Sequence, residues 1–170
     1  QHLEQFPVDV FQTGSGTSTN MNANEVVATL AARQSGQAVH PNDHVNCSQS
    51  SNDVIPTAIH VSAELALANS LMPSLHRLAE VIAAREAGLT DSIKTGRTHL
   101  MDAMPLTLAQ ELGTWSAQPS SAEARIDDTL VRLRRLPIGG TAVGTGINAH
   151  PQFGRRVARG LAKLSGSRFS

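Results

Sequence analysis

The sequence feature that most constrains the fold is a helical spacing of apolar side chains in the middle of the chain. Its members recur every three or four positions and share one face of a helix: Val61, Leu65, Ala68, Met72, Leu75, Ala79 and Ile82. This pattern predicts a long helix from about residue 52 or 53 to Ala87, with Gly88 as its C-cap. Pro73 lies inside the pattern, and we expect it to kink or interrupt the helix.

Three more helices are predicted from similar patterns. A short helix from Asn24 to Ser35 should end at Gly36 and follow an irregular, polar segment over residues 1–22. A helix after Pro105 should kink or break briefly near Gln118 because of Pro119, and it should continue from a capping box. That box would pair Ser120 with Glu123, and its helix would run to Pro137. A last helix is expected over 151–164. Polar loops over 40–51, 94–105 and 139–148 separate these helices.

Composition favours an all-α fold. The chain has 170 residues, about one ordinary domain, and it is 40% hydrophobic with only 3% aromatic residues and no tyrosine. An aliphatic core of this kind suits helices better than a β-sandwich. We find no run of about 18 apolar residues that would predict a membrane span.

Charge and cysteine content narrow the partners and the compartment. Residues 126–170 carry 8 Lys/Arg and 2 Asp/Glu, but no nucleic-acid-binding motif surrounds the arginines, so a solvated helix face, or a face meant for an acidic partner segment, fits better than a nucleic-acid site. The single Cys47 excludes an internal disulfide and fits a reducing compartment. The chain starts at Gln1 without a basic-then-apolar leader, and we expect it to begin inside a longer protein.

Two site types are disfavoured by spacing. The stretches "GSGTST" and "GTGINA" imitate part of a dinucleotide motif, but no strand–helix–strand unit surrounds either one. His40, Asp43, His44 and Cys47 have metal-ligand side chains, yet Pro41 argues against a regular helix presenting both histidines on one face, and no second ligand cluster exists. We therefore predict neither a metal nor a cofactor.

Three polar loops are more informative, because each flanks a predicted helix. They contain Ser15 and Thr17, then Ser50 to Asn52, then Thr98 and His99. Each set could simply cap its helix. If the loops converge, they offer neutral donors beside a helix N-terminus, where a small carboxylate would bind, and Lys94 and Arg97 could add positive charge.

At these residues the sequence resembles class II fumarase, within the fumarase/aspartase superfamily. The resemblance covers nearly the whole chain and is carried by four stretches: "TGSGTSTNMNANEV", "HPNDHVNCSQSSNDVIPTA", "GRTHLMDAMPLTLAQE" and "GGTAVGTGIN". Three residues favour fumarase over aspartase, whose sequences tend to have Asn, Thr and Gln at these places: His40, Ser51 and His99. Another superfamily lyase, or a non-catalytic helical module that binds dicarboxylates or pairs with subunits, is the alternative.

The resemblance implies cofactor-free, reversible hydration of fumarate to (S)-malate by an α-helical homotetramer, each of whose active sites is built from three subunits. It implies a cytoplasmic enzyme, with the mitochondrial matrix as the alternative. The substrate-binding residues that it implies are Ser15, Gly16, Thr17, Ser50, Ser51, Asn52 and Thr98. His99 would be the acid/base residue that works with the catalytic water. A second, lesser dicarboxylate site would comprise His40, Pro41, Asn42 and Asp43.

The chain departs from the family pattern in one important way. The family's "GSSxMPxKxN" loop, which supplies a serine base, a lysine and an asparagine, does not occur in these 170 residues. We therefore expect the isolated chain to be inactive and to leave apolar helix faces uncovered. Residues 1–50 would be the end of an N-terminal domain, and 51–170 the first part of a central helical bundle whose remainder, with a C-terminal domain, lies elsewhere.

Overall fold

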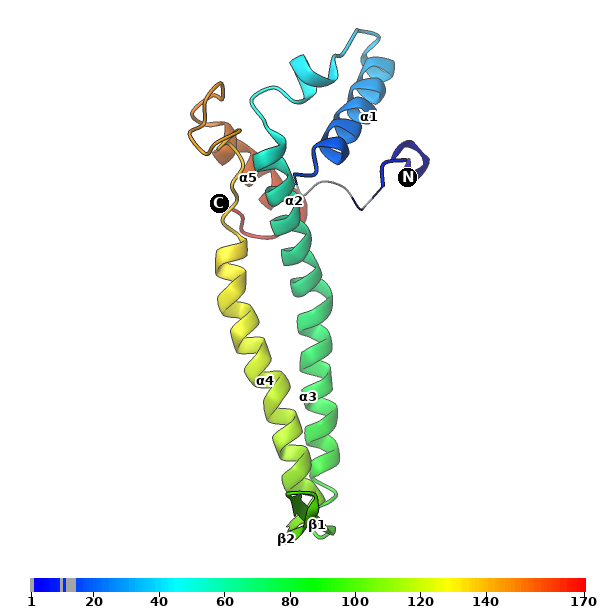
Figure 1. Ribbon diagram of the computed structural model, residues 1–170, viewed down its shortest axis with the longest axis vertical. Coiled ribbons are helices and arrows are strands. Elements are labelled where there is room, and N and C mark those ends of the chain that lie inside the picture. The colour runs from blue at the N-terminus through cyan, green and yellow to red at the C-terminus, as the bar shows by residue number, and fades with distance from the viewer. Residues whose placement is uncertain (1, 10, 12–14) are drawn as a thin grey trace. The chain divides into compact units, whose positions relative to one another are not determined.

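The computed structural model describes residues 2–9, 11 and 15–170. The all-α prediction is confirmed, since helices dominate and the one sheet is a two-stranded hairpin (Figure 1). The elements are η1 (Leu3–Gln5), α1 (Thr17–Ser35), η2 (Pro41–Val45), α2 (Ser51–Ala66), η3 (Leu67–Leu71), α3 (Met72–Glu86), β1 (Ile93–Thr98), β2 (Met101–Thr107), α4 (Leu108–Leu133) and α5 (Phe153–Ser165).

The chain forms two compact units. Unit 1 joins Gln1–Ser62 to Leu133–Ser170, and unit 2 is the intervening segment Ala63–Arg132. This division rests on contacts within the chain, and the expected domain boundary at residue 50 stays a prediction.

The long central helix is confirmed as one helical run with an interruption. It comprises α2, the π-helical turn η3 and α3. Pro73 is the second residue of α3, directly after the π turn. A proline has no N–H to donate, and its ring crowds the preceding turn of a regular α-helix. The wider π turn accommodates both effects, so the helical run continues. By length and composition alone Ser51–Glu86 could cross a membrane, contrary to the sequence prediction, although a core helix of a helical bundle meets the same test.

Helix α1 begins earlier than predicted. It starts at Thr17 instead of Asn24, and it ends as expected at Gly36, which adopts a left-handed conformation at φ 69°. Its buried residues are Asn20, Asn24 and Ala28, so polar side chains line its packed face. Val27 of the same helix is half exposed.

The segment 94–105 is a β-hairpin, and its assignment as a loop was wrong. Strands β1 and β2 pair antiparallel from Ile93↔Thr107 to Thr98↔Met101, with a bulge between Thr95 and Arg97. Gly96 lies in the bulge, where a Cβ would come within 2.7 Å of the Met104 carbonyl oxygen. The pairing depends on this close backbone approach, which a glycine permits. The polar composition of the strands gives no indication of it.

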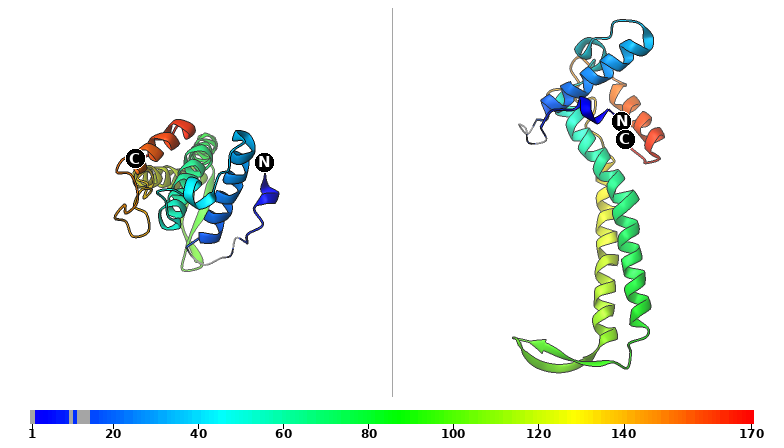
Figure 2. Two further views of the ribbon diagram at one scale, coloured as in Figure 1. Left: turned by 90° about the horizontal axis from the view of Figure 1, so that it is seen from above. Right: turned by 90° about the vertical axis from the view of Figure 1, so that its right-hand side faces the viewer.

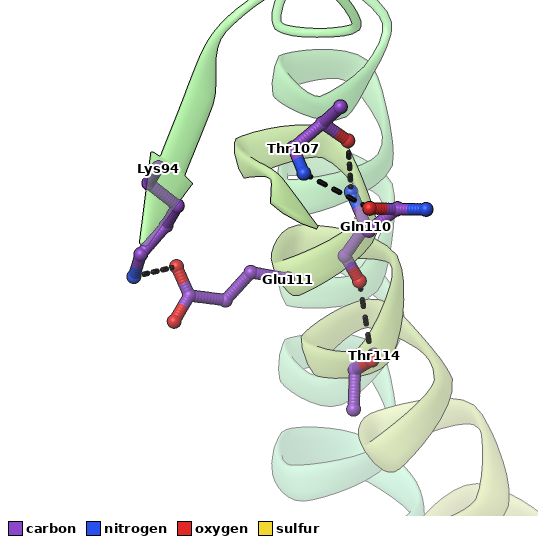
Figure 3. A network of polar contacts seen from close by, with 5 residues as sticks. All are labelled: Lys94, Thr107, Gln110, Glu111 and Thr114. Atoms are coloured by element: carbon purple, nitrogen blue, oxygen red, sulfur yellow. Dashed lines mark hydrogen bonds and ion pairs between the residues drawn. The ribbon is translucent and has the colours of Figure 1, made fainter. Parts of the chain in front are cut away.

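Helix α4 is unbroken, so the predicted break at Gln118 was wrong. Pro119 lies inside the helix. The Ser120 hydroxyl donates to the Ser116 carbonyl at 3.2 Å, as a residue within a helix does, and not to a new N-terminus. The capping box instead joins Thr107 and Gln110 at the true start of α4 (Figure 3).

In unit 2, α3 and α4 run side by side in opposite directions, and the β-hairpin extends from their connected ends (Figures 1 and 2). Gly113 permits a close approach of the two helices, because a Cβ there would lie 3.0 Å from Glu86 Oε1. His76 of α3 lies 3.8 Å from Glu123 of α4, further along the pair.

In unit 1, the segment after α4 is tied to α2 and to the last residues. His60 Nδ1 of α2 lies 3.1 Å from the carbonyl oxygens of Leu133 and Arg135. Ser170 exchanges backbone hydrogen bonds with Arg134 and Leu136. Phe169 is buried, as is Ala158 of α5. The predicted helix over 151–164 is confirmed as α5, within two residues at each end.

Candidate functional site

The N-terminus of α2 is capped, and its residues Ser50 to Asp53 form what we call the helix mouth. The Ser50 hydroxyl accepts the Asn52 N–H at 3.2 Å, while the Ser50 N–H donates to Asp53 Oδ1 at 2.9 Å. This is a reciprocal capping box with aspartate in the place of the usual glutamate. The Ser50 hydroxyl accepts in this arrangement, so its own proton remains to be donated to a ligand. Capping and ligand binding are therefore compatible at this residue.

Asp53 also joins the helix mouth to the glycine-rich loop 139–148. Its Oδ2 accepts the N–H of Gly139 at 3.0 Å and the N–H of Thr141 at 2.8 Å. Asn52 reaches the same loop, because its Nδ2 donates to the Ala142 carbonyl at 2.9 Å. The loop and the start of α2 thus form one polar assembly within unit 1.

The start of α1 belongs to the same assembly. Asn20 Nδ2 donates to Ser51 Oγ at 3.1 Å, and a Cβ on Gly16 would lie 3.0 Å from the Ile55 side chain. Gly16 is the N-cap of α1 at φ 62°, a conformation and a close packing that glycine tolerates best. The structure therefore brings the first two of the three predicted polar loops together.

The side chains at the start of α1 remain available to a ligand. Ser15 Oγ and Thr17 Oγ1 lie 3.0 Å apart and share one hydrogen bond, and both residues are exposed. Only one of the two hydroxyl protons is used in that bond, so the other can be donated. A pocket of about 230 Å³ opens next to this assembly, between Ser50 on one side and Thr141 and Asn148 on the other.

The predicted secondary site at residues 40–43 forms the start of the short helix η2. Pro41 is the first residue of this helix, and Asn42 is exposed. His40 is the N-cap, and its Nδ1 lies 3.2 Å from both the backbone N–H and Oδ2 of Asp43. His44 Nδ1 accepts the His40 N–H at 2.8 Å.

These bonds set the tautomer of His44 only. A ring whose Nδ1 accepts a backbone N–H carries its proton on Nε2 when neutral, so His44 offers an Nε2–H donor, whereas His40 Nδ1 faces both a backbone N–H and a carboxylate oxygen, which favour opposite tautomers. A donor suits a carboxylate better than it suits a metal ion. Over residues 2–9, 11 and 15–170, no three His, Cys, Asp or Glu side chains gather as metal ligands.

The third predicted loop, with Thr98 and His99, lies at the tip of the β-hairpin in unit 2. Its expected place beside Ser50 to Asn52 stays a prediction. Thr98 pairs with Met101, so His99 and Leu100 form a two-residue turn, at φ 49° and 61°. Two positive φ values are typical of a type I′ turn, which normally uses Asn or Gly. A residue other than glycine in the left-handed backbone region raises the free energy of the folded state by about 1–3 kcal/mol, and such residues cluster at functional sites.

The cations near this loop are already paired. Lys94 Nζ lies 2.7 Å from Glu111 Oε2 (Figure 3). Arg97 Nε lies 3.5 Å from Asp102 Oδ1 across the hairpin. The two cations that the sequence offered for an anion site are therefore engaged by carboxylates of their own unit.

Sequence reasoning missed the buried polar residues that support the site. Asp53 is only 2% exposed, yet it was considered merely as a helix start. Asn20 and Asn24 both donate to Asn46 Oδ1, at 3.3 and 3.0 Å, and so anchor α1 to the segment before α2. The missed signal was the spacing of Asn20 and Asn24, four residues apart on one face of a helix.

Comparison with known proteins identifies the family. The family described as "Lyase" matches residues 1–170. The chain belongs to the lyase family. The chain is 63% identical over 164 residues to the class II fumarate hydratase of Xylella fastidiosa, covering 96% of the chain and 35% of that protein. It is 56% identical over 167 residues to class II fumarate hydratase 2 of Pseudomonas aeruginosa, covering 98% and 36%.

Solved structures agree with the sequence comparison. The class II fumarase from Schistosoma mansoni superposes on this chain with a TM-score of 0.91 and 41% identity, covering 98% of the chain and 36% of that structure. The resemblance to class II fumarase is thus confirmed in sequence and in fold. The chain spans little more than a third of the length of the relatives it matches.

Proposed function

We propose that the protein to which these residues belong catalyses the reversible hydration of fumarate to (S)-malate. The observation that carries the proposal is the helix mouth at Ser50 to Asn52, next to Ser15 and Thr17. Hydroxyl and amide donors gather there at a helix N-terminus, in a chain 63% identical to a class II fumarate hydratase. Neutral donors suit a dicarboxylate that must also leave after turnover.

The chemistry explains why such donors are needed. Dehydration of malate removes a weakly acidic proton beside a carboxylate, and negative charge then accumulates on that carboxylate. Preorganised N–H and O–H groups aimed at this charge lower the barrier. In this proposal Ser15, Gly16, Thr17, Ser50, Ser51, Asn52 and Thr98 bind the substrate carboxylates.

His99 is the proposed acid/base residue. The hydroxyl that departs from malate needs a proton, and imidazole titrates in the useful range. The position of His99 supports the role, because it is exposed at the tip of a hairpin and held at a positive φ. A group at such a tip can reach a substrate bound to another surface, in keeping with an active site shared between subunits.

The remaining proposals concern the assembly and the compartment. We propose a homotetramer, because unit 2 exposes large apolar side chains, of which Leu78, Val81 and Trp115 are each about half exposed. We propose a cytoplasmic enzyme, since the exposed thiol of Cys47 fits a reducing compartment. Residues 40–43 are the proposed secondary dicarboxylate site.

We further propose that these 170 residues alone are inactive. The lysine, asparagine and serine of the "GSSxMPxKxN" loop would come from outside them. The supporting fact is that the chain spans about 35% of its relatives' length.

The decisive experiment measures fumarate absorbance with malate as substrate. The full-length protein should form fumarate from (S)-malate without added metal or cofactor, and the 170-residue chain should not. A full-length protein that leaves malate unchanged would overturn the proposed reaction. Turnover by the short chain would overturn the claim that residues outside it are essential.

A further inference from the structure

We propose that Asp53 is a positioning residue, which sets the orientation of the Asn52 amide by holding the glycine-rich loop. The inference rests on the proposed function, because it assigns Asn52 a ligand-binding role. Asp53 itself is buried and has no direct access to substrate. It acts through the backbone of Gly139 to Ala142.

The carboxylate of Asp53 is fully engaged by backbone donors. Oδ1 accepts the N–H of Ser50, and Oδ2 accepts those of Gly139 and Thr141, at distances of 2.8 to 3.0 Å. Hydrogen bonds to a carboxylate are roughly twice as strong as neutral ones, and burial strengthens them further. Asp53 thus fixes the backbone at the start of its own helix and that of a loop whose Gly139 lies 86 residues from it in sequence.

The loop needs such a restraint, because its backbone is strained. Thr141 is β-branched, yet it adopts φ 58°, where its Cβ crowds the backbone. Gly139 adopts φ 94° and lies so close to Gly154 that a Cβ would meet its Cα at 2.9 Å. Asp53 binds the N–H groups of both residues, the strained Thr141 and the closely packed Gly139.

The restrained loop then determines how Asn52 faces its surroundings. The residue after Thr141 is Ala142, whose carbonyl oxygen accepts the Asn52 Nδ2 donor at 2.9 Å. Asn52 is exposed, so this bond decides which face of its amide is turned to the loop and which to a ligand. Nδ2 carries a second N–H, which can be donated to a ligand carboxylate beside the loop, whereas a flipped amide would set Oδ1 against the Ala142 carbonyl oxygen and remove both donors from this position.

A double-mutant cycle in the full-length protein tests this relay. The variants are Asp53→Asn, Asn52→Ala and the combination, with kcat/KM for malate as the readout. Asp53→Asn keeps the size of the side chain but removes one acceptor, and it should lower kcat/KM about tenfold. Asp53→Ala should lower it further, since asparagine still offers one carbonyl oxygen. Asp128→Asn, an exposed aspartate of α4, is the matched control and should leave kcat/KM unchanged.

The combined variant separates positioning from general stability. If Asp53 acts through Asn52, Asp53→Asn should cause less than a twofold further loss in the Asn52→Ala background. Losses that multiply in the double variant would overturn the inference.

Hydrogen exchange gives an independent readout that does not depend on activity. In Asp53→Asn, peptides covering residues 137–147 should exchange faster than in the parent protein, while those from α3 should not change. Unaltered exchange in the loop would overturn the inference. If Asn52→Ala were as active as the parent, the proposed role of Asn52 would fail, and the exchange result alone would decide whether Asp53 restrains the loop.

Discussion

Thr107 and Gln110 cap each other at the first turn of α4. The Gln110 N–H donates to Thr107 Oγ1 at 3.1 Å, and the Thr107 N–H donates to Gln110 Oε1 at 2.9 Å (Figure 3). We expect Thr107→Ala to lower the free energy of unfolding by about 0.5–2 kcal/mol, because a helix N–H loses its partner. Urea titration measures the change. Thr107→Ser retains the hydroxyl and should stay within about 0.5 kcal/mol of the parent. Equal losses for both variants would mean that the methyl group, not the cap, matters.

Replacing Pro119 should stabilise the protein. The proline has no N–H, so the carbonyl of Trp115 lacks its helical partner, although α4 continues past it. Pro119→Ala restores the bond and should raise the free energy of unfolding by about 1–3 kcal/mol, as measured in urea. Ala124→Pro, at an exposed position of the same helix, should destabilise by a similar or larger amount. A destabilised Pro119→Ala variant would show that the packing around α4 requires proline.

Gly16 and Gly36 form a natural pair for separating backbone strain from packing. They adopt φ 62° and φ 69°, but a Cβ at Gly16 meets the Ile55 side chain at 3.0 Å, whereas one at Gly36 meets nothing within 4 Å. Gly36→Ala should cost about 1–2 kcal/mol for the left-handed backbone alone. Gly16→Ala should cost about 1–3 kcal/mol more, because Ile55 must move. Thermal unfolding of the two variants measures the difference, and equal melting temperatures would contradict the packing contribution.

His99→Asn tests the acid/base role while sparing the hairpin. Asparagine tolerates the positive φ of this turn well, so the backbone should keep its conformation. We expect kcat for malate dehydration in the full-length protein to fall on the order of 100-fold to 10,000-fold.

His40→Asn is the matched comparison, because it makes the same change at an exposed residue of the proposed secondary site. It should reduce turnover far less than His99→Asn. A nearly normal rate for His99→Asn would remove His99 from the catalytic residues, and an equally deep loss for His40→Asn would contradict the secondary assignment of residues 40–43.

Local patterns predicted those parts of the fold whose cause is local. The run from α2 to α3 and helix α5 follow from apolar periodicity, and Gly36 ends α1 as its backbone freedom suggests. The hairpin was missed because strand pairing over Ile93 to Thr107 is a relation between segments, and neither strand has an alternating apolar pattern. The break at Pro119 was wrongly expected because propensity was given more weight than the packing of a long helix.

The candidate site likewise contains residues that the sequence indicated and residues whose roles depend on distant partners. Residue types and motif resemblance indicated Ser50, Ser51 and Asn52, and the structure joins them to Gly16 and Asn20. Asp53 could not be assigned its role from sequence, because its partners lie 86 and 88 residues away. Nor does a sequence reveal that Ala142 orients an asparagine, since the bond depends on a main-chain carbonyl.

The division of unit 1 into two sequence segments has a consequence for the order in which the protein folds. Unit 2 lies between them and is built from neighbouring elements, so its contacts close short loops and form quickly. The hydrogen bonds of Asp53 close a far longer loop. The entropic cost of closing it falls once the antiparallel helices α3 and α4 have paired, because that pairing shortens the effective chain length between residues 62 and 133. We therefore expect pulse-labelled exchange during refolding to protect the amides of α3 and α4 before those of Gly139 and Thr141. Simultaneous protection would mean that the two units fold as one cooperative step.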